Sequence, residues 1–595
     1  MFSKAVAGIG PTPFQTHPVS DSDRAVLVAT ELITPTSPMS TGAPQEVPAS
    51  AVPPPRPRAP GRTVLWILLT LFAIEFYAFD QIGAHPHTKI YPRWFDQIQY
   101  LTEAYTGHEY AQTHGFASGL LHSLTNPSAQ GTLHDVYSVI AFQLLGPSRS
   151  AALALNIIAL IAWQVSLFWA ARRLLRSDWV ALVLAMLPAA LFGPWRSIPG
   201  SAFDFRLDHL AMCALGVAVT LAVPTDGFRH RRNSLIFGVA VGVTLLTRFL
   251  TGTYLVLILI LLLGWIACGA NRGRRMGNLL LAAAIAFTLA APVYWINRDW
   301  IWNYYWIGHY TGPESAIRNP NFGLLQSTNF VVRHLYQEHL GAFFCGLVGA
   351  FTVVLALFRR AGRCADRPGP WAVGLITVLA PALILILHVQ KSPVVLGVMA
   401  PGVLVLLLAL WHALTVKGAA PPRMPLLAGA AALGCLGYFL SAQAKPAFDP
   451  ETAASLRRVT QFGELIAKRA RDRGLTNPRI AVDQVTDALD GQILRVTTYE
   501  RTGKWVPFEM MLPTGIAEPT EEEVMDRLKL SDFVFVTTAS PQSNYPYDRK
   551  LAALSPTVLA WCAAELVEVE RFSLYGSQFI LYERPWTPRV AAGKP

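Results

Sequence analysis

The chain has 595 residues, of which 52% are hydrophobic and only 15% are charged, and its mean hydropathy is +0.35. A soluble protein of this size needs far more charge to cover its surface. Repeated apolar runs of about 16–23 residues are each long enough to cross a hydrocarbon core of roughly 30 Å as a helix. Composition therefore excludes a soluble enzyme and predicts an α-helical polytopic membrane protein.

The net charge of +11 would suggest a nucleic-acid partner in a soluble chain. Here the basic residues lie mainly between apolar runs, where they direct membrane topology, and no nucleic-acid partner is expected. The six cysteines form no C-x-x-C pair, so neither a disulfide framework nor a zinc site is supported.

Residues 1–62 are rich in Pro, Ser, Thr and Ala and lack hydrophobic periodicity, which predicts a disordered, Pro-rich cytoplasmic tail. A transmembrane domain follows over residues 63–443, with about eleven spans. These are expected at about 63–83, 149–171, 178–194, 207–223, 235–250, 252–268, 277–296, 341–358, 371–388, 393–415 and 424–442.

Clusters of basic residues follow alternate spans, and another cluster ends the tail. The tail contributes Arg56, Arg58 and Arg62, and the loops contribute Arg172, Arg173, Arg176, Arg229, Arg231, Arg232, Arg272, Arg274, Arg275, Arg359, Arg360, Arg363, Arg367, Lys417 and Arg423. Because cytoplasmic loops are enriched in Lys and Arg, the N-terminus is expected inside and the C-terminus outside. The predicted location is the cell (inner) membrane.

Two long connections then face outward, at 84–148 and 297–340. Within the first, the apolar part of 120–146 is too short to span and predicts a helix lying in the interface. From about Ala444 the composition changes: an amphipathic helix ends at Gly474, and 479–483, 532–538 and 579–584 are typical of strands. Residues 444–595 are therefore expected to form an extracytoplasmic α/β domain, whose role no phosphate loop or hydrolase motif reveals.

The first outward connection contains RWFDQIQYLTEAY, an amphipathic stretch with an early acid. Asp96, Tyr100 and Glu103 follow i, i+4, i+7 spacing and would share one face of a helix near headgroup depth. A carboxylate placed there can take a proton from an arriving hydroxyl as a general base. An ordinary helix cap is the alternative interpretation of Asp96.

Further charged groups lie in the same outer layer. Asp204 and Asp208 stand where the fourth span begins, and could orient an acceptor, help bind a metal or simply cap the helix. Arg248 separates two apolar runs and Lys391 follows another, positions where cations are expensive. A lipid-linked phosphate would explain both cations, whereas snorkelling to headgroups would explain each singly.

The second outward connection combines aromatic and charged side chains. They include His309, Tyr310, Glu314 and Arg318, within WNYYWIGHYTGPESAIRNP. Such a mixture suits contact with a sugar or a lipid headgroup, and it equally suits an interfacial aromatic belt.

Four segments resemble motifs of the GT-C membrane glycosyltransferases in their order along the chain and in the side of the membrane on which they are expected. The resemblance is to the branch that contains lipid A aminoarabinose transferases, protein O-mannosyltransferases and lipopolysaccharide-core transferases. The segments are FDQIQYLTEA, HDVYSVIAFQLLGPS, RLDHLAMCALG and LLTRFLTGTYLVLILILLL, and QKSPVVLGVMAPGVLVLLLAL extends the likeness to residue 415. Where the family often has Lys-Pro-Pro or His-Pro-Pro, this chain has His134, Asp135 and Val136.

The resemblance implies transfer of a sugar from a polyprenyl-phosphate donor to an envelope glycan, lipid or protein acceptor on the outer face of the membrane. It makes Asp96 the catalytic acid, with Tyr100 as its companion. It also implies that Arg248, Lys391 and His134 contact the donor phosphate, and that direct displacement inverts the anomeric carbon. A divalent cation (Mg or Mn) between Asp96 and Asp208 is compatible with this pattern, although nothing in the spacing requires one.

Other functions remain open from the sequence. A transporter or flippase of lipid-linked sugars would bury charges at the bilayer midplane and often shows repeated halves, neither of which is evident. A non-catalytic envelope-assembly protein would use its α/β domain to bind cell-wall polymer. An oligosaccharide-transferring relative would carry a Trp-Trp-Asp signature in its C-terminal domain, which this chain lacks.

Overall fold

A computed structural model describes most of the chain beyond residue 59. The described residues are 60–84, 95–195, 200–311, 321–357, 368–414, 424–443, 450–476, 478–482, 491–506, 508–510, 520–538, 548–574 and 577–585. The predicted tail over 1–62 therefore lies outside the described residues, except for its last three.

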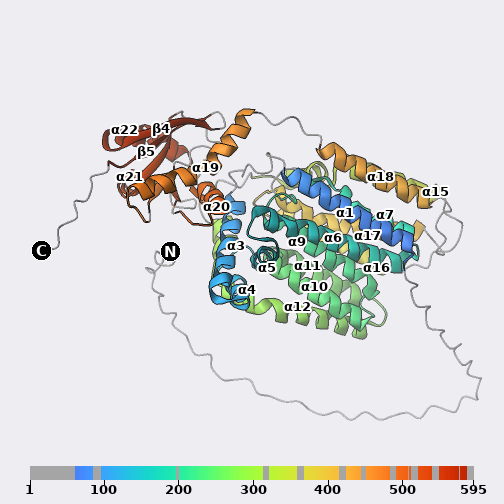
Figure 1. The fold of residues 1–595 in the computed structure, drawn as a ribbon. Coiled ribbons are helices and arrows are strands. Elements are labelled where there is room, and N and C mark those ends of the chain that lie inside the picture. The colour runs from blue at the N-terminus through green and yellow to red at the C-terminus, as the bar shows by residue number, and fades with distance from the viewer. Residues whose placement is uncertain are drawn as a thin grey trace, which may run out of the picture. The chain divides into compact units, whose positions relative to one another are not determined.

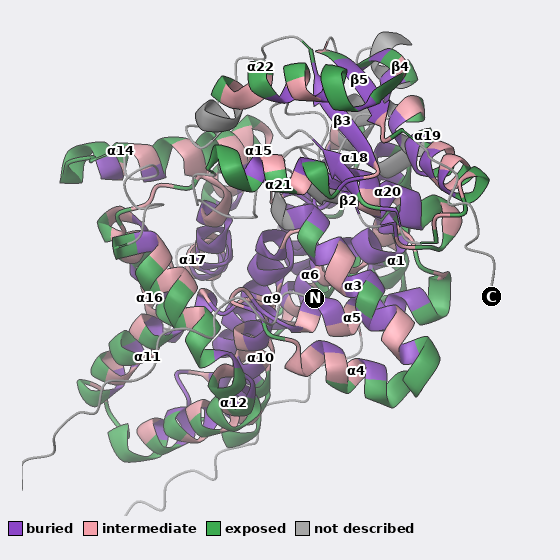
Figure 2. Cartoon of the chain, turned by 90° about the vertical axis from the view of Figure 1, so that its left-hand side faces the viewer, coloured by how far each residue is buried: buried purple, intermediate pink, exposed green. Residues whose placement is uncertain are grey.

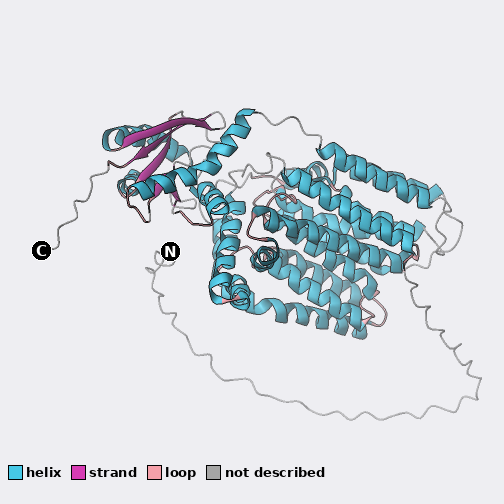
Figure 3. Cartoon of the chain, in the orientation of Figure 1, coloured by secondary structure: helices cyan, strands magenta, loops and turns pink. Residues whose placement is uncertain are grey.

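A bundle of long helices makes up most of the described chain (Figures 1 and 3). It contains α1 (Arg62–Ala84), α6 (Arg149–Leu175), α7 (Asp178–Ala190), α9 (Leu207–Ala222), α10 (Arg231–Thr247), α11 (Thr251–Ala267), α12 (Arg272–Ile301), α15 (Gly341–Leu357), α16 (Pro368–Leu387), α17 (Ala400–Leu414) and α18 (Met424–Gln443). Each predicted span overlaps one of these helices. Among the described residues, seven helical segments are long and apolar enough to cross a membrane. The protein is therefore mostly helical and embedded in a membrane.

The centre of the bundle is formed by helices that are apolar on every side. In α7 every residue from Val180 to Ala190 is buried, the pattern of a helix surrounded by other helices. Gly216 of α9 lies against the indole of Trp163 of α6, and a Cβ at Gly216 would lie 2.5 Å from that ring. Figure 2 shows buried residues concentrated in α6, α9 and α17, whereas α11, α12 and α16 are exposed along one side. Their exposed residues include Phe287 and Trp295, as expected of helices that face lipid.

Within its described residues, the connection over 84–148 that is expected to face outward contains three helices: α3 (Phe95–His114), α4 (Phe116–Thr125) and α5 (Leu133–Leu145). Figure 1 shows α3 running across the ends of the bundle helices, and α5 packs against both α3 and α6. The single interfacial helix expected within 120–146 is divided into α4 and α5. Asn126 ends α4 because the following Pro127 disfavours the helical conformation of the residue before it.

The connection over 297–340, also expected to face outward, is largely helical in its described residues. The helix α12 continues into a π-helix, η2 (Trp302–Thr311), while α14 (Leu324–His334) and a second π-helix, η3 (Leu335–Leu340), lead into α15. Aromatic side chains four residues apart stabilise η2: the ring centroids of Trp302 and Trp306 lie 5.4 Å apart, and those of Trp306 and Tyr310 lie 5.3 Å apart. The expected loop over 297–340 is thus helical in its described residues except 321–323.

The C-terminal region forms a five-stranded sheet with helices. Its elements are α19 (Pro450–Asp472), β1 (Ile480–Val482), α20 (Gly491–Thr502), β2 (Phe508–Met510), α21 (Glu521–Lys529), β3 (Phe533–Thr537), α22 (Asp548–Glu565), β4 (Val567–Leu574) and β5 (Ser577–Glu583). The strand order is β2-β1-β3-β5-β4. Strand β1 pairs in parallel with β2 and β3, whereas β5 is antiparallel to β3 and β4. The three expected strands coincide with β1, β3 and β5, and Gly474 follows α19 with φ +70°.

Candidate functional site

A buried ion pair joins two of the predicted site residues. Asp208 lies in the first turn of α9 and Arg248 directly follows α10, and the Arg248 Nη1 contacts the Asp208 Oδ1. The side chain of Asp208 is only 8% exposed and that of Arg248 only 14%. The Nε of Arg248 is also buried and has no hydrogen-bond partner among the described residues. This guanidinium therefore keeps one N–H donor that an anion could occupy.

The position of Arg248 is fixed by the segment between α4 and α5. The backbone N–H of Thr132 donates to the carbonyl of Leu246 at 3.1 Å, and that of Phe249 donates to the carbonyl of Gln130 at 2.7 Å. Between these bonds, a Cβ at Gly131 would overlap the carbonyl group of Thr247. Glycine is needed here because the two backbones approach so closely. The segment between α4 and α5 thus stabilises the non-helical backbone between α10 and α11.

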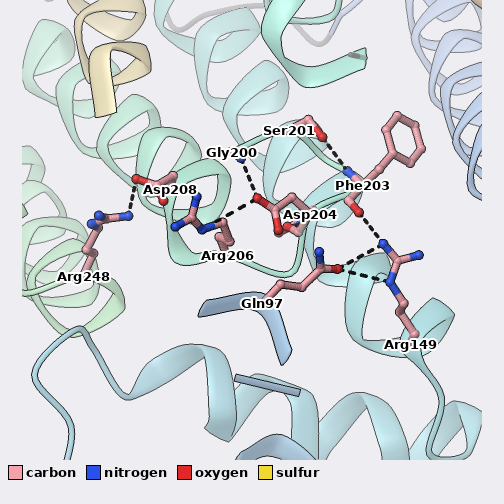
Figure 4. A network of polar contacts seen from close by, with 10 residues as sticks. Gln97, Arg149, Gly200, Ser201, Phe203, Asp204, Arg206, Asp208 and Arg248 are labelled. Carbon is pink, nitrogen blue, oxygen red and sulfur yellow. Dashed lines mark hydrogen bonds and ion pairs between the residues drawn. The ribbon is translucent and has the colours of Figure 1, made fainter. Parts of the chain in front are cut away.

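A second acid, Asp204, organises the segment before α9 (Figure 4). The backbone N–H of Gly200 donates to the Asp204 carboxylate at 2.7 Å, and the Arg206 Nε lies 3.9 Å from the same oxygen. Burial raises the pKa of Asp204 to about 7, although Arg206 opposes the shift. The two predicted acids therefore have different surroundings: Asp204 shapes its own loop, and Asp208 faces Arg248.

The same segment anchors the start of α3. The Arg149 guanidinium, at the first residue of α6, donates to the Gln97 side chain of α3 at 3.0 Å and to the carbonyl of Phe203 at 2.8 Å. Asp96 is the neighbour of Gln97 in the first turn of α3. The side chain of Asp96 lies outside the described residues, as do Glu314 and Arg318.

Tyr100 and Glu103, expected on one face of a helix, both lie near the start of α5. The rings of Tyr100 and His134 meet edge to face with centroids 4.9 Å apart, and Tyr100 also interacts electrostatically with Arg248. The His134 Nε2 lies 3.0 Å from the Asp135 Oδ1, and Glu103 is close to both. Burial raises the pKa of Glu103 to about 7, and the charge of Asp135 adds to the shift.

Aromatic contacts join η2 to the residues after α16. The His309 ring lies 5.5 Å from that of Tyr305 and 5.7 Å from that of His388, and Tyr310 lies 5.4 Å from His388. The Tyr305 hydroxyl donates to the Gln130 side chain at 3.2 Å. This series leads from the segment that holds Arg248 to the neighbourhood of Lys391.

Lys391 has a different environment from Arg248. Its Nζ donates to the carbonyls of Leu385, Ile386 and His388 at 3.1, 2.8 and 2.5 Å, at and just beyond the end of α16. An ammonium in this position satisfies the unpaired carbonyls of a helix C-terminus. Partial burial lowers the pKa of Lys391. The three hydrogen bonds use all three of its donors, so contact with a phosphate would have to displace some of them.

A pocket opens beside the ion pair, lined by Asp208, Arg248, Tyr254, Gly200, His339 and Val394 among others. The sequence did not single out His339, a buried residue whose Nε2 lies 2.8 Å from the carbonyl of Pro393.

The sequence analysis also did not single out Arg149. A sequence signal existed for Arg149, because an arginine directly precedes the apolar run of α6 on the same outer side as the acids.

The C-terminal region contacts the helix that carries Asp96. The Tyr105 hydroxyl donates to the Glu500 carboxylate of α20 at 2.6 Å, and the Trp505 indole donates to Glu109 at 2.8 Å. Trp505 also stacks on Tyr499, with ring centroids 4.1 Å apart. One helix, α3, thus connects the polar groups at the end of the bundle with the sheet region.

No protein-family model matches the chain, and no curated protein matches it. Solved structures do match it. Two are of ArnT from Cupriavidus metallidurans, one in the apo state and one bound to undecaprenyl phosphate; each gives a TM-score of 0.53 at 14% identity and covers 87% of this chain and 97% of that chain. The protein therefore shares the fold of these ArnT structures over most of its length.

Proposed function

We propose that the protein is a membrane glycosyltransferase that moves a sugar from a polyprenyl-phosphate donor to an envelope glycan, lipid or protein acceptor. The observation that carries this proposal is the buried Arg248, which pairs with Asp208, retains a free Nε donor and borders a pocket in a fold similar to that of ArnT. The ArnT structure that contains undecaprenyl phosphate supports the donor class.

The proposed topology follows the basic clusters that alternate along the sequence. Eleven spans place the tail over 1–62 in the cytoplasm and the α/β domain over 444–595 outside the inner membrane. The pocket beside Arg248 then opens toward the outer leaflet, where a donor with a long polyprenyl chain can reach it laterally.

In the proposed reaction the acceptor oxygen attacks the anomeric carbon while the bond from that carbon to the donor phosphate oxygen breaks. The phosphate leaves with the electron pair, so it needs positive charge rather than a proton. Arg248 supplies that charge, and its pair with Asp208 holds the guanidinium in place. Asp96 takes the proton of the acceptor hydroxyl, and the anomeric configuration inverts in a single displacement.

The remaining predicted residues have secondary roles in this proposal. Tyr100, Glu103, His309 and Tyr310 contact the acceptor or the sugar, together with Glu314 and Arg318. His134 approaches the donor phosphate next to Tyr100, and Lys391 adds positive potential from the end of α16. A cation shared by Asp96 and Asp208 would compete with Arg248 for the Asp208 carboxylate, so the proposed reaction uses none there.

Envelope glycans from a deletion strain, analysed by mass spectrometry, test the proposal. One glycan is expected to lose a single sugar, and the wild-type gene restores it whereas Asp96→Asn and Arg248→Met do not. An unchanged glycan profile, or full restoration by Asp96→Asn in a folded protein, would overturn the assignment. Loss of lipid-linked sugar from the outer leaflet alone would instead indicate a transporter.

A further inference from the structure

We propose that Glu103, His134 and Asp135 bind a divalent transition-metal ion, at a site separate from the Asp208–Arg248 pair. Within the described part of the chain, these three residues are the one group of three potential ligands whose donor atoms all lie within 4.8 Å of one another. They come from two helices, because Glu103 belongs to α3 while His134 and Asp135 open α5.

Unsatisfied polar atoms are the independent observation that points to a ligand. His134 and Asp135 are only 3% and 2% exposed, yet both ring nitrogens of His134 and the Asp135 Oδ1 lack hydrogen-bond partners among the described residues. The 3.0 Å approach of the His134 Nε2 to the Asp135 Oδ1 is thus a close contact without good hydrogen-bond geometry. Buried polar atoms without partners destabilise the fold, and more so where a charge is involved, so proteins rarely keep them without a reason.

The charges of Glu103 and Asp135 also favour a bound cation. Two carboxylates and one imidazole share a small, water-poor volume. Within the described chain, Glu103 accepts a hydrogen bond from the neutral side chain of Gln99 at 2.9 Å. The N-terminus of α5 offsets part of the Asp135 charge, but the described chain gives the Asp135 Oδ1 no hydrogen bond. A divalent cation would neutralise both acids at once.

Ligand chemistry selects the class of ion. An imidazole with two carboxylates suits Zn²⁺ or Mn²⁺, whereas Mg²⁺ and Ca²⁺ prefer oxygen ligands alone. Ligands of a tetrahedral Zn²⁺ lie roughly 3.4 Å from one another at metal–ligand distances of 2.0–2.2 Å. Side-chain movements of about 1 Å therefore suffice to close the group around an ion. Three protein ligands leave at least one coordination position for water or another molecule.

Metal content of the full chain, purified without a polyhistidine tag in lipid nanodiscs, tests this site. After treatment with EDTA, the protein is titrated with Zn²⁺ and with Mn²⁺, followed by elemental analysis and, for Mn²⁺, by electron paramagnetic resonance. Wild type is expected to retain one ion per chain. Each of Glu103→Gln and Asp135→Asn is expected to weaken binding by roughly 100-fold or more, since even supporting groups around metal sites contribute 10–100-fold. Asp226→Asn, which changes an exposed acid far along the chain, is the control and should bind as wild type does.

Thermal unfolding separates loss of the site from loss of the fold. Removal of the ion should lower the unfolding temperature of wild type, whereas the two variants should be insensitive to EDTA and at least as stable as metal-free wild type, because each removes a buried charge. Folded wild type that binds neither ion, binding of Mg²⁺ in preference to both, or equal binding by the variants would each overturn the proposal. None of these results depends on transferase activity.

Discussion

Replacement of Asp208 by Asn should destabilise the protein strongly, because it leaves the Arg248 guanidinium buried without its counter-ion. Both side chains are at most 14% exposed, so solvent screens the pair poorly. Removal of one partner from such a pair typically costs about 3–5 kcal/mol. Unfolding of the purified chain by SDS in mixed micelles measures the change in free energy of unfolding.

The matched control is Asp226→Asn, since Asp226 forms an exposed pair with Arg229 at 3.3 Å in the same bundle. Exposed pairs contribute about 0–1 kcal/mol, so this change should have little effect. The double variant Asp208→Asn with Arg248→Met should recover most of the stability lost by the single variants, because no unpaired charge remains. A cost for Asp208→Asn no larger than that of the control, or simple addition of the two single effects, would refute the reasoning.

Undecaprenyl phosphate gives a second measurement on the same variants. Its phosphate would supply the negative charge that Arg248 lacks in Asp208→Asn, so the added lipid should raise the unfolding temperature of this variant more than that of wild type. It should fail to do so in the double variant, which has no guanidinium at this position.

Four further changes address other parts of the molecule. Asp96→Asn should reduce sugar transfer about 10²–10⁴-fold in a purified assay while the unfolding temperature stays near that of wild type. Asp204 has a pKa raised from 3.8 to about 7 by burial, so the stabilisation from its protonated form is complete below about pH 4 and is lost as pH rises to about 7; Asp204→Asn should flatten the fall in stability between about pH 4 and pH 7. Trp505→Ala removes the hydrogen bond to α3 and the stack on α20, and should increase amide exchange in α3 and slow transfer without unfolding the sheet. Gly131→Ala places a Cβ against the Thr247 carbonyl group and should lower both stability and transfer, whereas retention of wild-type values would show that the loop adapts.

Much of the architecture could be predicted from the sequence because a lipid environment leaves few choices. Apolar runs of sufficient length must form helices in lipid, so each expected span overlaps a helix, and the strands β1, β3 and β5 follow from β-branched and aromatic residues. The short strand β2 and the exposed strand β4 carry weaker patterns and were missed. The helix η2 was also not predicted, because Trp302 and Trp306 stack on one another only once that helix has formed.

The sequence by itself determined the chemical types at the site: acids at the starts of α3 and α9, a basic residue between α10 and α11, and an order of motifs that resembles that of GT-C enzymes. Only the tertiary structure decided their partners. It pairs Asp208 with Arg248, assigns Lys391 to the end of α16 and brings Glu103 to His134 and Asp135. The physical reason is that helical periodicity specifies which face of one helix a residue occupies, whereas contacts between helices depend on how several helices pack against one another.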